Sequence, residues 1–240
     1  MGLFQKLRGN PARSPALAGA AVPGMRASPL ATPGPHLAAR GGRPSNGLKD
    51  FILHLEDLNH GRLLDLGPVW QTTVSFFIER GFKVYTDDLL SSWKEFLRTD
   101  EERFRSLAVG DETFEFSPPA RAERFLSTTF QYAEQSFDAV LAWDLLDYLD
   151  SAMVARITAR LSDLMRPGGA ILALFHSRPP DAFYRYRVLD HQNFEMLPAP
   201  ALFKLDHVFQ NREILNLFSR FHSTKSYVGR DQIREGLFLK

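Results

Sequence analysis

Short apolar runs alternate with amphipathic segments along most of the chain. Residues 137–143 form an almost wholly apolar run, which indicates a buried strand of a parallel sheet. Residues 151–165 carry Val154, Ile157 and Leu161 at helical spacing, which indicates an amphipathic helix. Because such runs and segments alternate, we expect right-handed crossovers and a parallel sheet. The predicted strands are 63–66, 82–85, 125–130, 137–143 and 170–175, and the predicted helices are 48–58, 72–80, 91–108 and 151–165.

The pattern changes to strict alternation after the fifth predicted strand. Tyr184 and Tyr186 would face one side of a strand, and Arg185 and Arg187 would face the other. Turn-like residues follow, so we predict a β-hairpin inserted at 183–198, where it could cover an acceptor pocket. Alternation on a hairpin explains the repeated Tyr-Arg pairs without a nucleic-acid ligand.

The C-terminal segment closes the predicted sheet. A helix capped by Asn211 is followed by runs at 224–228 and 233–239, whose short connection requires an antiparallel pair. The third strand is assigned to 125–130 in preference to 113–116. The predicted fold is therefore α/β and Rossmann-like, with a doubly wound, seven-stranded, mostly parallel sheet and an antiparallel C-terminal strand pair.

The first 46 residues differ in composition from the rest of the chain. Residues 9–46 hold seven of the 15 prolines and almost no aromatic residue. Such a segment buries too little apolar surface to offset its ordering entropy, so we predict a disordered tail at 1–46 and a folded domain at 47–240. The tail has no acidic residue, and its alternative interpretations are an organelle transit segment or a basic contact with nucleic acid or anionic lipid.

Charge and composition exclude several classes of function. The net charge is +1, but the tail holds six of the 29 basic residues, which leaves 23 basic against 28 acidic residues in the domain. A mildly acidic domain argues against nucleic-acid binding. The chain has no cysteine and its seven histidines lack metal-ligand spacing, so we expect no metal site. No apolar run is long enough to span a bilayer, and we expect a cytoplasmic protein.

Polar residues follow the first two predicted strands. The first strand ends in Asp65-Leu66-Gly67, and the second strand ends in Asp87-Asp88. A glycine at this turn lets a ligand approach backbone that a side chain would shield. An acid at the tip of the second strand can accept hydrogen bonds from a ribose. This outline predicts a nucleotide-type binding unit of the doubly wound kind.

Two longer motifs make the pattern more specific. They are FDAVLAWDLLDYL at 137–149 and LMRPGGAIL at 164–172. The order and spacing of these motifs and the two strand-end motifs resemble those of the class I S-adenosylmethionine-dependent methyltransferases. The resemblance covers residues 48–240. The resemblance implies S-adenosyl-L-methionine as the cofactor and a methyl acceptor, which we expect to be a small molecule.

The resemblance also implies roles for individual residues. Several residues are expected to contact the cofactor. In order from its methionine end, through the ribose and the adenine, to the acceptor side, they are Asp65, Gly67, Trp70, Gln71, Asp88 (or Asp87 at a one-residue shift), Thr129 and Asp144. A strand-end acid can also cap the next turn or helix, as Asp147 and Asp150 could beside Asp144. The candidate catalytic residues are Asp144, on the acceptor side, and His176, at the tip of the fifth strand. His176 is either a general base toward the acceptor or an ordinary loop histidine.

The glycine motif departs from the family's pattern. Val69 and Gln71 stand where glycines are expected, and Pro68 removes a backbone donor. Either the pocket is rearranged, with Trp70 or Gln71 in contact with the ligand, or it is closed. The sequence therefore favours a small-molecule methyltransferase, and its alternative is a catalytically inactive, methyltransferase-like module for binding or assembly. A third interpretation is nucleic-acid modification, which would use the basic tail and residues 184–187.

Overall fold

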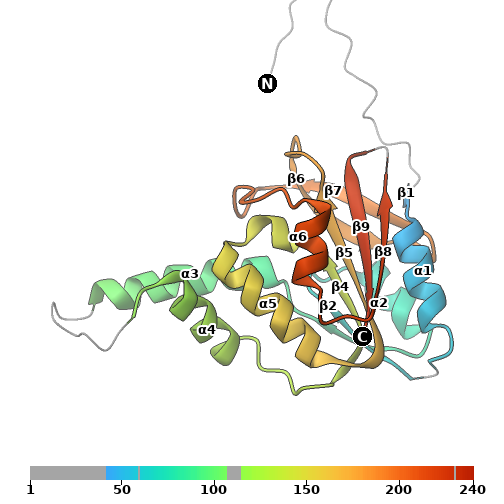
Figure 1. Cartoon of the computed structure of the whole chain (residues 1–240), viewed down its shortest axis with the longest axis horizontal. Helices are drawn as coiled ribbons and strands as arrows, with labels where there is room; N and C mark the ends of the chain where they lie inside the picture. The colour runs from blue at the N-terminus through green and yellow to red at the C-terminus, as the bar shows by residue number, and fades with distance from the viewer. Residues whose placement is uncertain (1–41, 59, 107–114, 230) are drawn as a thin grey trace, which may run out of the picture. The chain divides into compact units, whose positions relative to one another are not determined.

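The computed structural model describes residues 42–58, 60–106, 115–229 and 231–240, so residues 1–41 of the tail predicted for 1–46 lie outside the described residues. The centre is a six-stranded sheet in the order β3-β2-β4-β5-β9-β8 (Figure 1). The strands β3, β2, β4 and β5 pair in parallel, and β9 and β8 pair antiparallel. The strands are β2 (Arg62–Asp65), β3 (Lys83–Thr86), β4 (Phe137–Trp143), β5 (Met165–His176), β8 (Ser223–Val228) and β9 (Ile233–Leu239).

Helices cover both faces of this sheet. One core cluster joins the sheet to α3, α4, α5 and α6, and a second cluster joins it to α1 and α2 (Figure 1). Both faces of the parallel strands are therefore buried, which explains the continuous apolar runs in the sequence. The helices are α1 (Asn46–Leu55), α2 (Gln71–Ile78), α3 (Leu89–Ser106), α4 (Pro118–Thr128), α5 (Ser151–Leu164) and α6 (Asn211–Leu217), with a 3₁₀ turn η1 (Leu145–Tyr148) after β4.

The prediction of a strand at 125–130 is wrong. Its first residues belong to α4, which begins after Ser117, whose hydroxyl accepts a hydrogen bond from the backbone N–H of Ala120. Ala122 and Phe125 are buried three residues apart, which is the spacing of one helix face. A short apolar run such as 125–130 does not by itself distinguish a strand from a helix. Among the described residues, the central sheet consequently has six strands rather than the predicted seven.

Capping residues explain where two of the other helices begin. The Asp150 side chain accepts from the backbone N–H of Met153 at 2.9 Å and is the cap of α5. Asn211, the predicted cap of α6, is instead its first helical residue. The residue before it, Gln210, donates its backbone N–H to the carboxylate of Glu213 at 2.6 Å, and this bond satisfies a donor at the start of the helix.

A second, smaller sheet contains the predicted hairpin. The strands β6 (Phe183–Val188) and β7 (Asn193–Ala199) pair antiparallel, over nearly the range predicted from the alternation. Residues Arg43–Pro44 form β1, which pairs with β7 at the edge of this sheet. The predicted tail includes these two residues, which in the structure belong to the smaller sheet.

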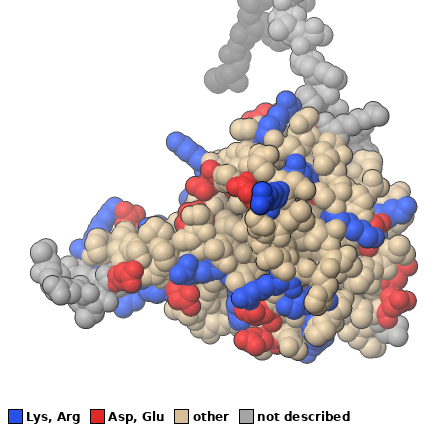
Figure 2. Space-filling view, in the orientation of Figure 1, with Lys and Arg blue, Asp and Glu red and all other residues tan. Residues whose placement is uncertain are grey.

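Charged side chains are dispersed over the face of the domain that Figure 2 shows. On the face shown in Figure 2, basic and acidic side chains alternate over the same elements, and neither sign forms a continuous stripe. Many of the charges belong to ion pairs on exposed helices, such as Arg98 with Glu95 and Glu102 on α3. This face lacks the concentrated basic patch that is typical of nucleic-acid-binding domains.

Arg43 joins the N-terminal edge of the domain to the central sheet. Its guanidinium forms ion pairs with Asp231 and with Glu235 of β9. Glu235 is 2% exposed and also accepts from the Ser45 hydroxyl at 2.8 Å and from the Gly47 backbone N–H at 2.6 Å. A buried carboxylate of this kind depends on its cationic partner, because an uncompensated charge in the interior is costly.

The substitution Arg43→Ala should therefore lower the free energy of unfolding by about 3 kcal/mol, since it leaves Glu235 buried without its ion pair. The matched control is Arg98→Ala, which removes an exposed ion-paired arginine and should cost less than about 1 kcal/mol. Urea unfolding followed by circular dichroism measures both. Equal losses for the two variants would contradict a structural role for Arg43.

Candidate functional site

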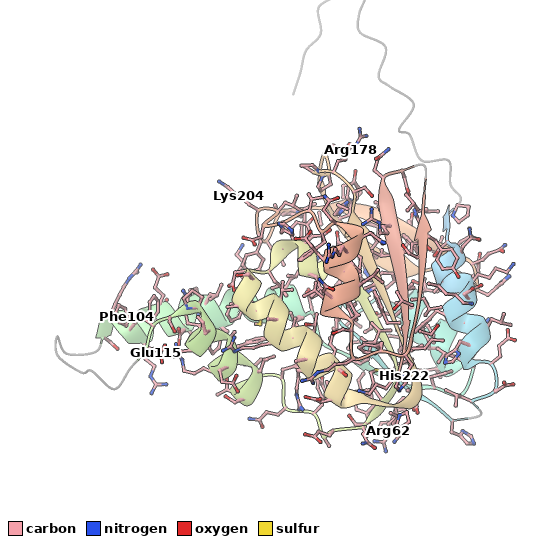
Figure 3. All side chains as sticks on the ribbon, viewed as in Figure 1. Arg62, Phe104, Glu115, Arg178, Lys204 and His222 are labelled. Carbon is pink, nitrogen blue, oxygen red and sulfur yellow. The ribbon has the colours of Figure 1, made fainter. Side chains whose placement is uncertain are left out.

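The parallel strands end at one edge of the central sheet. Arg62, at the start of β2, and Arg178, just beyond the end of β5, lie at opposite ends of the sheet (Figure 3). The connection after β2 leads through α2 to β3 on one side, whereas β4 leads through α5 to β5 on the other. The switch point of the topology thus lies between β2 and β4, where doubly wound sheets bind ligands outside the strand ends.

Asp65 ends β2 and is fully buried. Its Oδ1 accepts from the Gly67 backbone N–H at 3.0 Å and from the Trp143 Nε1–H at 2.7 Å. Its Oδ2 is buried and has no hydrogen-bond partner in the described part of the chain. Burial disfavours the charged form and raises the pKa of Asp65 to about 6, although the bonds from Trp143 and Gly67 act in the opposite direction.

Gly67 lies directly against the indole of Trp143. A Cβ at Gly67 would be 2.8 Å from Trp143 Nε1, closer than real side chains approach. Trp143 itself has φ +46°, a left-handed conformation that bulky residues rarely adopt. Such strain persists only where surrounding contacts enforce it. The bare backbone of Gly67 is therefore used, in this conformation, to accommodate a side chain of the same chain.

Asp88, which follows β3, is paired with an arginine of the hairpin. Arg185 Nη1 and Nη2 donate to the two carboxylate oxygens of Asp88 at 3.0 Å each, and the Ser91 hydroxyl donates to it at 2.7 Å. The neighbouring Asp87 is partly buried, which raises its pKa, and accepts from the Ser92 hydroxyl at 3.2 Å. The acid expected at the ribose thus already has a bidentate cationic partner.

Asp144 and His176 meet at the ends of β4 and β5. Asp144 Oδ2 lies 2.9 Å from His176 Nε2 and accepts from the Tyr186 hydroxyl at 2.8 Å. The backbone N–H of His176 donates to Asp147 Oδ2 at 2.7 Å. Burial raises the pKa of Asp147 well above its usual range. The two residues predicted for the acceptor side are therefore in direct contact, inside a buried polar cluster.

The cleft between these residues is closed. Its walls include Gly67, Pro68, Trp143, Arg185 and Tyr186, and the space among them is about 10 Å³. A volume of this size holds about one water molecule. The sequence indicated that the hairpin could cover a pocket, but it did not indicate that Arg185 and Tyr186 enter the cleft or that Trp143 lies against Gly67.

The other predicted residues do not line the cleft. Trp70 is partly buried, with the Arg187 guanidinium 5.5 Å from its ring centroid. Gln71 is exposed at the start of α2 and donates to the Ser75 hydroxyl at 2.9 Å. Thr129 is exposed at the C-terminal end of α4. Cofactor contact by these three residues stays a prediction.

Two features are absent from the described ranges. Over these residues, no group of three or more His, Cys, Asp or Glu side chains is arranged to hold a metal ion. No helix within the same ranges is both long enough and apolar enough to cross a membrane.

Comparison with protein-family models gives no match, and comparison with curated proteins gives none either. Several solved structures do match. One is a Burkholderia thailandensis 1,6-didemethyltoxoflavin-N1-methyltransferase with bound 1,6-didemethyltoxoflavin and S-adenosylhomocysteine, at 16% identity and TM-score 0.43 over 82% of this chain and 79% of that chain. A second is TehB from Haemophilus influenzae, at 14% identity and TM-score 0.42 over 80% and 61%. A third is an S-adenosylmethionine-dependent methyltransferase from Mesorhizobium loti, at 14% identity and TM-score 0.41 over 80% and 96%.

At these identities and scores, the likeness by itself says nothing about the ligand or the activity of this chain. Four parallel strands with helices on both faces, followed by the antiparallel β9 and β8, agree with the α/β, Rossmann-like sheet predicted from the sequence, with one strand fewer among the described residues.

The raised pKa of Asp65 gives a pH prediction. A carboxyl whose folded-state pKa exceeds its unfolded value of about 4 contributes stability that is complete below that value and is lost as the pH rises through about 6. Asp65→Asn should remove this loss, which amounts to about 2 kcal/mol of unfolding free energy between about pH 4.5 and 7.5.

Denaturant unfolding of the wild type and the variant across this pH range measures the difference. The control is Asp163→Asn, which changes an acid on the exposed face of α5 and should retain the wild-type pH dependence. An Asp65→Asn variant with the wild-type slope would show that Asp65 is not responsible.

Proposed function

We propose that the chain is an S-adenosyl-L-methionine-dependent methyltransferase that acts in the cytoplasm on a small-molecule acceptor. The observation that carries this proposal is the position of Asp65-Leu66-Gly67, Asp88 and Asp144. They follow three neighbouring parallel strands, β2, β3 and β4, at the edge where the topology switches. Ligands of doubly wound sheets bind at this edge.

The residues at this edge fit the cofactor chemically. Asp88 supplies a carboxylate for the ribose hydroxyls, and Gly67 supplies backbone without a side chain. Asp65 Oδ2 is a buried acceptor without a partner among the described residues, so it is available to an N–H group of a ligand. A bound cofactor would supply an activated methyl group. The protein would then align donor and acceptor and exclude water.

Binding requires the hairpin side of the cleft to open. Trp143 and Tyr186 are 4% and 2% exposed, and their rings fill the space beside Gly67. Withdrawing a buried aromatic side chain costs about 2–3 kcal/mol. The open form is therefore a minor population, and the apparent affinity for the cofactor falls in proportion to that population.

The second candidate function is a catalytically inactive module for binding or assembly. The closed cleft favours it, because the strand-end acids are already paired within the chain. Val69 and Gln71 in place of glycines agree with it. This candidate predicts that the protein binds neither S-adenosylmethionine nor S-adenosylhomocysteine, and that it copurifies with a stable partner.

The two candidates differ in the response to opening the cleft. Arg185→Gln removes the bidentate partner of Asp88 and should raise the affinity for S-adenosylhomocysteine about ten-fold, since a charge-assisted pair no longer competes with the ribose. The control is Arg187→Gln on the same strand, because Arg187 pairs with Glu195 instead of Asp88. Isothermal titration of the full chain measures both affinities.

The outcomes separate the candidates. Tighter binding by the Arg185→Gln variant alone supports a methyltransferase site that the hairpin covers. Equal affinities for the two variants would show that the Arg185 pair is not the barrier. If no variant binds S-adenosylmethionine or S-adenosylhomocysteine at millimolar concentration, the proposed function fails and the second candidate is supported.

A further inference from the structure

The side chain of Tyr186 lies in the candidate site as a bound ligand would. It comes from β6 of the hairpin rather than from the central sheet. Its ring is stacked on the Trp143 indole, with centroids 5.4 Å apart and planes at 9°. Phe194 of β7 packs edge-on against the same ring at 5.8 Å. A phenol thus lies against two aromatic side chains, a geometry that favours planar aromatic rings.

The hydroxyl of this phenol meets the polar pair at the strand ends. Asp144 Oδ2 accepts from the Tyr186 hydroxyl at 2.8 Å and lies 2.9 Å from His176 Nε2. Both Asp144 and His176 are about as buried as the core, at 4% exposure each. A buried carboxylate next to an imidazole is a hydrogen-bond acceptor for a phenolic hydroxyl and a possible recipient of its proton.

Two further polar atoms of the same turn have no partner. Asp147 Oδ1 and the Tyr148 hydroxyl are buried and lack hydrogen bonds to the described residues. Leaving such an atom unsatisfied costs about 1–3 kcal/mol. These atoms are consequently available to polar substituents of another molecule that enters the cluster.

We propose, as an inference that rests on the function proposed above, that Tyr186 stands in for the methyl acceptor, and that the acceptor is a small planar aromatic compound carrying a hydroxyl group. The acceptor displaces Tyr186 from Trp143 and Asp144 and takes over both contacts. Stacking on the indole selects a flat ring, and Asp144 selects an O–H donor on that ring.

These residues can receive the proton that the methyl transfer releases. The acceptor hydroxyl donates to Asp144 Oδ2. As its oxygen forms a bond to the methyl carbon, the bond from that carbon to the sulfonium sulfur breaks and its electron pair neutralises the sulfur. The hydroxyl proton passes to Asp144, which shares it with His176 before its release to water. The products are the aryl methyl ether and S-adenosylhomocysteine.

Binding of 4-methylphenol, the side-chain analogue of tyrosine, tests the acceptor class. The controls are toluene, which lacks the hydroxyl, and 4-methylcyclohexanol, which lacks the planar ring. Titration of the full chain followed by nuclear magnetic resonance should show 4-methylphenol binding at least about ten-fold more tightly than either control, because only it makes both contacts.

A pair of variants tests whether Tyr186 competes with the acceptor. Tyr186→Phe keeps the ring but removes the competing hydroxyl, and it should raise the affinity for 4-methylphenol about ten-fold. The control is Tyr227→Phe on β8, which also removes a hydrogen bond from a phenol to a carboxylate, that of Asp50. The control should retain the wild-type affinity. Mass spectrometry for 4-methylanisole after addition of S-adenosylmethionine gives a second readout.

The acceptor class and the proposed function are tested by different measurements. The acceptor class is overturned if S-adenosylhomocysteine binds but 4-methylphenol binds no better than toluene in the wild type and in the Tyr186→Phe variant. Equal effects of Tyr186→Phe and Tyr227→Phe would also overturn it, since Tyr186 would then have no special relation to the ligand. Failure of S-adenosylhomocysteine binding rejects the proposed function, whereas phenol binding is measured without the cofactor.

Discussion

The carboxylate of Asp144 connects the hairpin to the central sheet. One of its oxygens lies within hydrogen-bond distance of both Tyr186 of β6 and His176 of β5. This oxygen is buried, so water cannot replace either contact if it is lost. Losing one would therefore leave a polar atom less well hydrogen-bonded in an interior of low dielectric constant, which costs free energy. The position of the hairpin against the strand ends, and with it the closed cleft, depends on this shared acceptor.

The closed cleft replaces ligand contacts with contacts inside the chain. Each strand-end acid has an internal donor: Asp65 has Trp143, Asp88 has Arg185, and Asp144 has Tyr186. A ligand that enters must therefore exchange one satisfied set of hydrogen bonds for another. Its net gain is the difference between the two sets, which is much smaller than the total. Affinity in this site is consequently governed by how readily the hairpin leaves.

The periodicity of apolar residues in the sequence predicted those strands that are buried on one complete face or on both faces. Residues 137–143 were predictable because both sides of the strand are covered, and 183–198 because alternation marks a hairpin. Residues 125–130 were not, since a short apolar run does not by itself distinguish a strand from a helix. The closure of the site was also not predictable. Alternation assigns Tyr186 to one side of a strand, but only tertiary packing decides what that side covers.

The closed cleft explains some of the sequence and structural features that suggested a ligand, but it does not explain all of them. Gly67 is required by the Trp143 indole, so the glycine alone does not indicate a cofactor. A permanently closed core would, however, be expected to satisfy its polar atoms. Asp65 Oδ2, Asp147 Oδ1 and the Tyr148 hydroxyl have no hydrogen-bond partner in the part of the chain that the structure describes, at a cost of about 1–3 kcal/mol each. Together with the strained backbone of Trp143, these atoms favour a second arrangement in which a ligand supplies the missing contacts.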